Sequence, residues 1–205
     1  MQAAAARGAH DLVYLDQCGF APTLPLNCTW ARVGTRPLLR YEAPQGRRVN
    51  VLGAYAPFGP QRRFVWASRL ASEGKLDSPA FLDFVCRDLL GVAGGLAALD
   101  RRARRPPRRR ARPCTIVLDN YGVHHSKVVK AALPKLAALG VAFYYLPPYS
   151  PKLNLIEPQW NVLKYHRLQE RSFTTGPALK AAVDAALLER TAELQVHAVH
   201  LPAVA

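Results

Sequence analysis

The sequence predicts an α/β fold, because short apolar runs that end in turn residues alternate with segments whose apolar residues recur at helical spacing. Its 205 residues fit one such domain and are enough to bury a sizeable core. No internal repeat is visible in the chain, so we expect one domain rather than a repeat array.

The first half of the chain is predicted to form an antiparallel meander. A strand begins almost at once, at about 11–16, and a loop is expected at about 19–25. Further strand-like runs, separated by glycine and proline turn signals, cover about 30–33, 38–41, 48–55 and 64–66.

The second half of the chain alternates helices and strands. Asp77-Ser-Pro79 is typical of a helix start, because proline is well tolerated in the first helical turn. The elements expected after it are a strand at about 115–119, a helix at 126–139, a strand at 141–146, a helix at 154–170 and a helix at 177–193.

The chain is strongly basic, with a formal net charge of +14 and a pI of about 10.2. An anionic partner is therefore expected, and nucleic acid is favoured over a membrane surface or an acidic protein. Much of this charge lies in one Arg/Pro-rich segment, 91–113, and without its eight arginines the net charge would be +6. These arginines are Arg101, Arg102, Arg104, Arg105, Arg108, Arg109, Arg110 and Arg112.

The Arg/Pro-rich segment has two interpretations. A run of like charges without a core pattern is usually a solvated surface loop. The alternative is a strip that contacts DNA phosphates and steepens the salt dependence of binding.

The cysteines and the apolar runs restrict the class of protein. The four cysteines have no CxxC spacing, which makes a zinc site improbable and suits a reducing compartment. No run has the length and apolarity of a membrane span, and the N-terminus lacks the apolar middle region of a signal peptide. We expect a soluble, cytoplasmic protein.

Two aspartates follow apolar runs that are predicted to be strands. Asp16 comes after Leu12-Val-Tyr-Leu15, and Asp119 comes after Thr115-Ile-Val-Leu118. Each carboxylate could simply cap the turn that follows it. Functional groups, however, often stand at the strand ends of open α/β sheets.

Glu157 lies at the start of a predicted helix, and two helix starts are compatible with the sequence. Asn154 could be the N-cap, with Glu157 at the third position, or Pro158 could be the first helical residue. Either arrangement places Glu157 near a helix N-terminus, which favours an ionised carboxylate. A plain capping glutamate is the alternative.

Together the three carboxylates indicate a divalent-metal site for phosphodiester chemistry. Mg²⁺ prefers oxygen ligands and keeps some of its positions for water and phosphate oxygens. Two such ions would activate an attacking water or 3′-hydroxyl and stabilise the leaving oxygen.

Four blocks of the sequence resemble the catalytic domain of mariner-superfamily DDE transposases, and the closest likeness is to the bacterial insertion-sequence branch. The blocks occur in the order of that family, within about 12–188. They are Asp16-Gln-Cys-Gly-Phe20, Thr29-Trp-Ala-Arg-Val-Gly-Thr-Arg-Pro37, Val117-Leu-Asp-Asn-Tyr-Gly-Val-His124 and Leu146-Pro-Pro-Tyr-Ser-Pro-Lys-Leu-Asn-Leu-Ile-Glu-Pro-Gln-Trp160.

The resemblance implies an α/β, ribonuclease-H-like fold in which helices flank a mixed sheet. It implies that Asp16, Asp119 and Glu157 are the catalytic, metal-binding residues, which hold Mg²⁺ or Mn²⁺, with two ions expected. The implied activity is cleavage of DNA at transposon ends and joining of the 3′ ends to target DNA, by a homodimer. By the same matching, supporting roles fall to Asn120, His124 and Asn154, although His124 could equally be a loop histidine that packs on the sheet.

Other side chains carry weaker expectations. Trp30 and Trp160 are expected to be core or loop-packing aromatics rather than platforms for stacking bases. Five basic residues are candidates for lining a DNA channel: Lys127, Lys130, Lys164, Arg167 and Arg171.

The chain departs from the family in three respects. Gln17 stands where the family usually has an acidic residue, and 91–113 is expected to be an insertion loop. The chain, 1–205, is interpreted as one catalytic domain with a core at 11–190, without the N-terminal helix-turn-helix domain of the family. A separately encoded helix-turn-helix subunit is therefore an expected partner, beside double-stranded DNA in the bacterial nucleoid.

Two alternatives remain open. The chain could be an inactive, truncated remnant that binds nucleic acid non-specifically through its arginines. It could also be a ribonuclease H that acts on RNA–DNA hybrids, although the last sequence block disfavours this reading.

Overall fold

A five-stranded sheet forms the centre of the structure, with the strand order β3-β2-β1-β4-β5. The computed structural model describes residues 1–23, 31–35, 48–59, 62–99, 107–168 and 173–199, and within the last range the side chains of 173–195. The strands are β1 (Asp11–Phe20), β2 (Val49–Ala56), β3 (Arg63–Leu70), β4 (Cys114–Leu118) and β5 (Val141–Tyr145).

The sheet is mixed, because β1, β2 and β3 pair antiparallel whereas β1, β4 and β5 pair parallel. The antiparallel part confirms the predicted meander. In the parallel part the register aligns Tyr14 of β1 with Val117 of β4. Asp16 and Asp119 each lie two residues beyond this pair, so the register directs both aspartates to the same end of the sheet.

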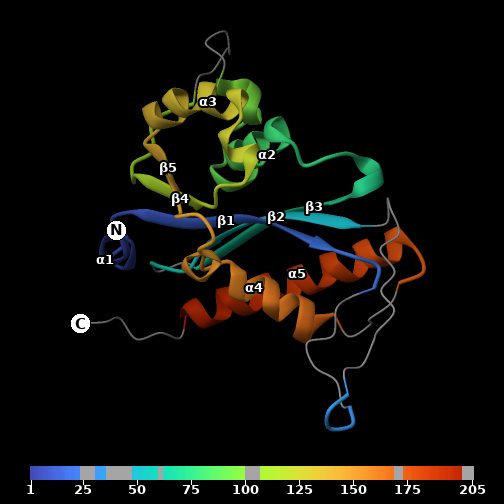
Figure 1. Ribbon diagram of the computed structural model, residues 1–205. Helices are drawn as coiled ribbons and strands as arrows, with labels where there is room; N and C mark the ends of the chain where they lie inside the picture. The colour runs from blue at the N-terminus through green and yellow to red at the C-terminus, as the bar shows by residue number, and fades with distance from the viewer. Residues whose placement is uncertain (24–30, 36–47, 60–61, 100–106, 169–172, 200–205) are drawn as a thin grey trace.

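Helices cover both faces of the sheet (Figure 1). One face carries α2 (Ser78–Phe84) and α3 (Lys127–Ala138), and the other carries α4 (Glu157–Val162) and α5 (Gly176–Val199). A short helix, α1 (Gln2–Ala6), precedes β1. Short 3-10 turns occur at Ala71–Glu73, Gly95–Leu99, Gly122–His125 and Pro151–Leu153, and single π-helical turns follow α2 and α4 at Val85–Leu89 and Leu163–Arg167.

Two hydrophobic clusters form the core, one on each face of the sheet. Strand alternation divides β1 between them: Tyr14, Cys18 and Phe20 belong to the cluster under α4 and α5, and Val13 and Leu15 belong to the cluster under α2 and α3. Asp16 has the parity of Tyr14 and Cys18, so its side chain leaves the strand on the α4 side.

Local capping explains where two of the helices begin. The Asp77 carboxylate accepts a hydrogen bond from the backbone N–H of Ala80, and the Ser126 hydroxyl accepts one from Val129. Both are side-chain N-caps of the kind that starts helices. They confirm the predicted helix starts at 77–79 and near Ser126.

Several predicted boundaries in the first half were wrong. β1 does not end near Asp16 with a loop from residue 19, because Gly19 and Phe20 continue the pairing with β2, opposite Asn50 and Val49. Residues 31–33 form no strand. The predicted strand at 38–41 and the position of Trp30 lie outside the described residues.

The predicted helix at 154–170 begins later and is less regular than expected. Its first helical residue is Glu157, Ile156 is the N-cap without a side-chain cap, and Pro158 is the second helical position. The α-helical part ends at Val162 and a π-helical turn follows. Asn154 as the N-cap was therefore wrong, and the alternative start at Pro158 was off by one residue.

No helix in the described ranges is both long enough and apolar enough to cross a membrane.

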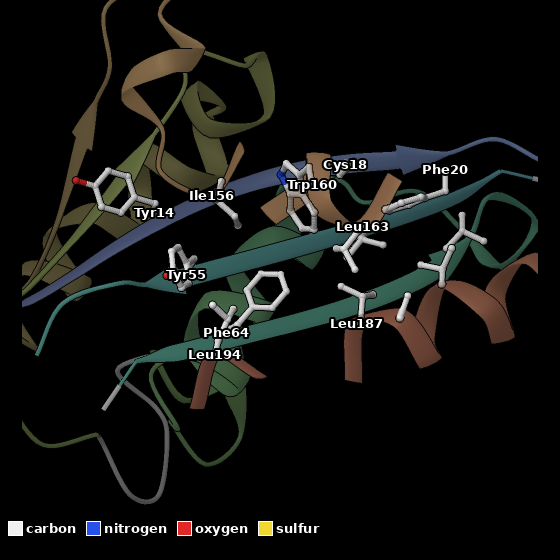
Figure 2. Close-up of a cluster of buried hydrophobic side chains, with 14 of the residues drawn as sticks. Tyr14, Cys18, Phe20, Tyr55, Phe64, Ile156, Trp160, Leu163, Leu187 and Leu194 are labelled. Atoms are coloured by element: carbon white, nitrogen blue, oxygen red, sulfur yellow. The ribbon is translucent and has the colours of Figure 1, made fainter. Parts of the chain in front are cut away.

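Trp160 of α4 anchors this helix to the sheet, and Figure 2 shows its ring among the side chains of the buried cluster. The side chain is 2% exposed and its ring packs edge-on against Phe64, with 5.8 Å between the centroids. Below it lies Gly53 of β2, where a Cβ would meet Trp160 at 2.3 Å and Ile156 at 3.1 Å. The expectation that Trp160 is a core aromatic is therefore confirmed, and only glycine leaves room for it at position 53.

Substitution of Gly53 tests this packing. Gly53→Ala should lower the free energy of unfolding by about 1–3 kcal/mol, because the added methyl group displaces the Trp160 ring from a close-packed site. Urea unfolding followed by tryptophan fluorescence measures the change. Gly122→Ala is the matched control, since a Cβ there meets nothing within 4 Å; equal effects of the two substitutions would contradict the packing argument.

Candidate active site

Two adjacent parallel strands position the aspartates. Asp16 lies inside β1 rather than at its tip, because pairing with β2 extends the strand four residues beyond it. Asp119 follows directly after Leu118, the last residue of β4. β4 thus ends where β1 continues, so Asp16 lies in the part of β1 that pairs with β2 but no longer with β4.

Glu157 reaches the end of β4 from a helix rather than from a strand. It is the first residue of α4, after the turn Pro151–Leu153. One cavity of about 460 Å³ is lined by Asp16, Asp119 and Glu157 together with Asn120, Asn154 and the loop at 146–151. The three carboxylates that the sequence singled out therefore face a common space, although they come from three distant segments.

Burial dominates the electrostatics of Asp16. Burial raises the pKa of this carboxyl from 3.8 to about 7, against the backbone hydrogen bond at Gln17, and the nearby charges of Glu157 and Asp119 raise it further. The indole N–H of Trp160 donates to Oδ2 of Asp16 at 3.1 Å, which favours the ionised form and fixes the side chain. Asp16 is therefore a carboxyl group whose ionised form burial disfavours.

The pKa of Asp119 is lowered, in contrast to that of Asp16. Its Oδ1 lies 3.0 Å from Nδ1 of His124 and accepts a hydrogen bond from the backbone N–H of Tyr121 at 3.1 Å. The hydrogen bond from His124 is the main cause of the lowered pKa of Asp119, and burial opposes it. Asp119 therefore stays ionised.

Burial and a nearby lysine shift the pKa of Glu157 in opposite directions. Burial is the main cause of the raised pKa of Glu157, the charge of Lys164 lowers it, and the charge of Asp119 raises it. The ammonium of Lys164 lies over the ring of Phe20, 5.7 Å from its centroid. Of the lysines suggested for a DNA channel, Lys164 thus lies beside the carboxylates.

Two of the three supporting residues, Asn120 and Asn154, line the same cavity, and the third, His124, contacts Asp119. Asn120 donates from its side-chain amide to the backbone oxygen of Leu146, which ties the loop after β4 to the end of β5. Asn154 donates to the backbone oxygen of Leu15 at 3.4 Å, and its own Oδ1 is buried with no partner among the described residues. His124 is 1% exposed and also stacks near Phe81, at 4.7 Å between centroids. It is thus both a packed histidine and a partner of Asp119.

The donor set of this cavity fits a hard divalent cation. All three carboxylates and the orphaned Oδ1 of Asn154 offer oxygen atoms, the ligand type that Mg²⁺ and Mn²⁺ prefer. Burial is the main cause of the raised pKa of Asp16, and the nearby charges of Glu157 and Asp119 add to it, so a bound cation would lower this pKa. In the described residues no three acidic, histidine or cysteine side chains are grouped closely enough to hold one ion, so the fit concerns the kind of ligand atom and not its distance from a metal.

Two described arginines of the Arg/Pro-rich segment lie at the end of β1 away from the carboxylates. Arg110 and Arg112 pair with Asp11 at 2.5 Å and 3.5 Å, and Asp11 begins the strand. Asp16 lies five residues further, roughly 16 Å away along the strand. Arg101, Arg102, Arg104 and Arg105 lie outside the described residues, so DNA contact by this segment stays a prediction.

One neighbour of the site was missed in the sequence. Trp160 was interpreted as packing alone, yet its N–H holds Asp16. The signal was present, since Trp160 follows Glu157 by three residues and so lies on the same side of the helix.

The chain belongs to the DDE superfamily of endonucleases, because the model of that family matches residues 11–180. This confirms the resemblance at the level of the family and the enzyme class; the bacterial branch stays a prediction. No curated protein sequence matches the chain.

Solved structures of Mos1 transposase complexes share its fold, which confirms the ribonuclease-H-like mixed sheet. The Mos1 strand transfer complex is 13% identical, with a TM-score of 0.55 over 94% of this chain and 51% of that chain. The Mos1 paired-end complex with the left transposon end is 15% identical, with a TM-score of 0.56 over 94% and 52%. The Mos1 mariner paired-end complex with Mg is 14% identical, with a TM-score of 0.53 over 93% and 51%. The chain thus spans about half the length of these proteins.

Asp16 should destabilise the metal-free protein at alkaline pH. Because burial raises its pKa to about 7 from 3.8, the free energy of unfolding falls as the pH rises through this window and stays low above it. Asp16→Asn removes the charge and keeps an acceptor for the Trp160 N–H. At pH 8 in EDTA it should therefore stabilise the fold, by on the order of 2–4 kcal/mol at about 1.4 kcal/mol per pKa unit; the gain should vanish near pH 4.

Asp119→Asn is the matched comparison, and thermal unfolding of both variants and the wild type in EDTA between pH 4 and pH 8 measures the changes. The pKa of Asp119 is lowered, so its ionised form stabilises the fold, and the substitution should reduce the melting temperature at pH 8. Changes of the same sign in both variants would show that the two carboxylates do not differ as described.

Proposed function

We propose that this chain is the catalytic domain of a mariner-type DDE transposase, which cuts DNA at the ends of an insertion sequence and joins the 3′ ends to target DNA. The observation that carries the proposal is the shared cavity of Asp16, Asp119 and Glu157, next to the end of β4 in a ribonuclease-H-like sheet. Membership of the DDE superfamily of endonucleases supports it.

Asp16, Asp119 and Glu157 would hold Mg²⁺ or Mn²⁺, and two ions are proposed. When bound, such ions lower the pKa of a coordinated water or hydroxyl and stabilise the departing oxygen of a phosphodiester. Support comes from the solved relatives, since Mos1 mariner paired-end complexes have been described with Mn and with Mg.

The surrounding residues would keep the carboxylates in place. The Trp160 N–H fixes Oδ2 of Asp16, and the contacts of His124 and Tyr121 fix Oδ1 of Asp119. In this proposal each aspartate therefore offers its other oxygen to the cavity. Asn120 and Asn154 would act by ordering the loops around it, through their bonds to the backbone of Leu146 and Leu15.

The proposed substrate is double-stranded DNA, both the transposon ends and the target. The basic composition of the chain supports this choice. The solved relatives are described as strand-transfer and paired-end complexes, which supports action as a homodimer that holds two ends. A separately encoded helix-turn-helix subunit would recognise the ends, and the bacterial nucleoid is the proposed location.

Removal of a single carboxylate tests the proposal. The wild-type chain should nick supercoiled plasmid in Mn²⁺, and EDTA should abolish the reaction. Asp119→Ala and Glu157→Gln should each lower the nicking rate by at least about 100-fold, because a metal-held nucleophile and leaving group account for several kcal/mol of the barrier. Gel quantification of nicked and linear plasmid gives the rates.

Asp88→Asn is the control, since this aspartate is exposed on the turn after α2, outside the cavity. It should nick like the wild type. Supplying a helix-turn-helix domain and the element's ends in trans should turn nicking into cleavage at defined positions. Equal activity of the wild type and Asp119→Ala under these conditions would refute the proposal.

A second candidate is non-specific binding of nucleic acid by an inactive remnant, which the exposed Arg108 and Arg109 support. The test is a fourfold variant in which serine replaces Arg101, Arg102, Arg104 and Arg105. Under this second candidate, the variant should bind random duplex DNA at least about tenfold more weakly than the wild type at about 150 mM salt. Metal and Asp119→Ala should then have no effect on binding or nicking. Filter binding across a salt series measures this, and an unchanged salt dependence in the fourfold variant would exclude it.

A further inference from the structure

A second cavity of about 360 Å³ adjoins the carboxylates on the other side of β1. It shares Asp16 and Asp119 with the first cavity. Its other lining residues come from the end of β1, the start of β2 and the loop after β4: Gln17, Cys18, Gly19, Arg48, Asn50, Tyr121 and His124.

This cavity exists because β4 is shorter than β1. The two strands pair only from Asp11 to Tyr14 of β1, so the last part of β1 has β2 on one edge and the cavity on the other. Gln17 and Gly19 have the parity of Val13 and Leu15, and Asn50 pairs with Gly19. A polar strip therefore continues the apolar α2 face of the sheet beyond the helices.

Arg48 occupies a defined place over this strip. A Cβ at Gly19 would lie 2.1 Å from Nε and 2.1 Å from a terminal nitrogen of Arg48, so the guanidinium rests on the bare Cα of the glycine. The backbone oxygen of Arg48 accepts a hydrogen bond from Ala71 at 2.8 Å, which fixes the residue at the start of β2. Arg48 is exposed and lines this cavity together with Asp16 and Asp119.

Two buried polar atoms of the cavity residues lack partners. The side-chain nitrogen of Gln17 and Nε2 of His124 are both inaccessible and make no hydrogen bond among the described residues. A buried polar group without a partner is costly, so such atoms commonly mark a place that a ligand or water fills. The guanidinium of Arg48 is a donor, as is the amide of Gln17 once its side chain rotates toward the cavity, and a phosphate oxygen accepts hydrogen bonds from such groups.

The geometry points to a phosphodiester subsite formed by Arg48, Gln17 and Asn50, which binds the backbone of the DNA strand next to the phosphate at the carboxylates. This inference rests on the proposed function and extends it, because it assigns the side of the cavity along which the strand runs. A positive charge is needed there, since Asp16 and Asp119 would otherwise repel the neighbouring phosphate. Gly19 acts as a positioning residue, because its lack of a Cβ leaves room for the guanidinium of Arg48.

Binding to a fluorescent 25-base-pair duplex, measured by anisotropy in EDTA with the full chain, tests the subsite without catalysis. Arg48→Ala should weaken binding about tenfold, as expected for loss of one charge-assisted contact. It should also reduce the slope of log Kd against log salt by about one. Gly19→Ala should weaken binding in the same direction, and in the Arg48→Ala background it should have no further effect.

Arg87→Ala is the matched control, because this arginine is exposed and pairs with Asp83 on the turn after α2. It removes the same charge from the surface and should leave affinity and salt slope unchanged. The subsite is refuted when Arg48→Ala binds like Arg87→Ala. Where Gly19→Ala fails to fold by circular dichroism, Gln17→Ala, expected to weaken binding without changing the salt slope, takes its place.

The same samples separate this inference from the proposed function. Asp119→Ala should bind the duplex in EDTA with at least wild-type affinity and should lose nicking in Mn²⁺. Unimpaired nicking by Asp119→Ala overturns the proposed function, whereas wild-type affinity of Arg48→Ala overturns only the subsite.

Discussion

The contact of Trp160 with Gly53 and Asp16 is the constraint on which the site depends. Gly53 is the cross-strand neighbour of Asp16, so a ring that packs on this glycine brings its N–H to the carboxylate. Glu157 begins the same helix three residues earlier, and the seating of the ring therefore also sets the position of Glu157. One aromatic side chain thus joins the helical layer, the sheet and two of the three carboxylates.

The fold keeps these carboxylates close together although burial and mutual repulsion disfavour their charged forms. Hydrogen bonds from His124 and Tyr121 compensate Asp119, whereas Asp16 has the Trp160 N–H and burial raises its pKa to about 7. Such an arrangement stores unfavourable free energy that a bound cation would release. Sites that bind charged ligands are commonly less stable when empty, because the same groups that repel one another also bind.

The sequence revealed the features that depend on neighbours in the chain. Asp77 and Ser126 were recognisable as helix caps, and Asp119 as the residue that ends an apolar strand, because each signal lies within a few residues. The length of β1 and the start of α4 were misjudged, since the first depends on pairing with β2, and Asn154 bonds to Leu15 instead of capping. Convergence of Asp16, Asp119 and Glu157 was expected from their shared chemistry and from the family likeness, because no local pattern encodes the distance between the three segments.

The position of charge matters more here than its amount. Arg110 and Arg112 belong to the conspicuous arginine run, yet both pair with Asp11 at the beginning of β1. Arg48 lies outside this run, and its guanidinium lies over Gly19 in the cavity that Asp16 and Asp119 also line. The two glycines differ in what an added Cβ would displace: at Gly53 it would meet the buried ring of Trp160, whereas at Gly19 it would meet the end of an exposed, flexible arginine side chain. Gly53 is therefore the stricter constraint, because the Trp160 ring for which it leaves room also holds Asp16.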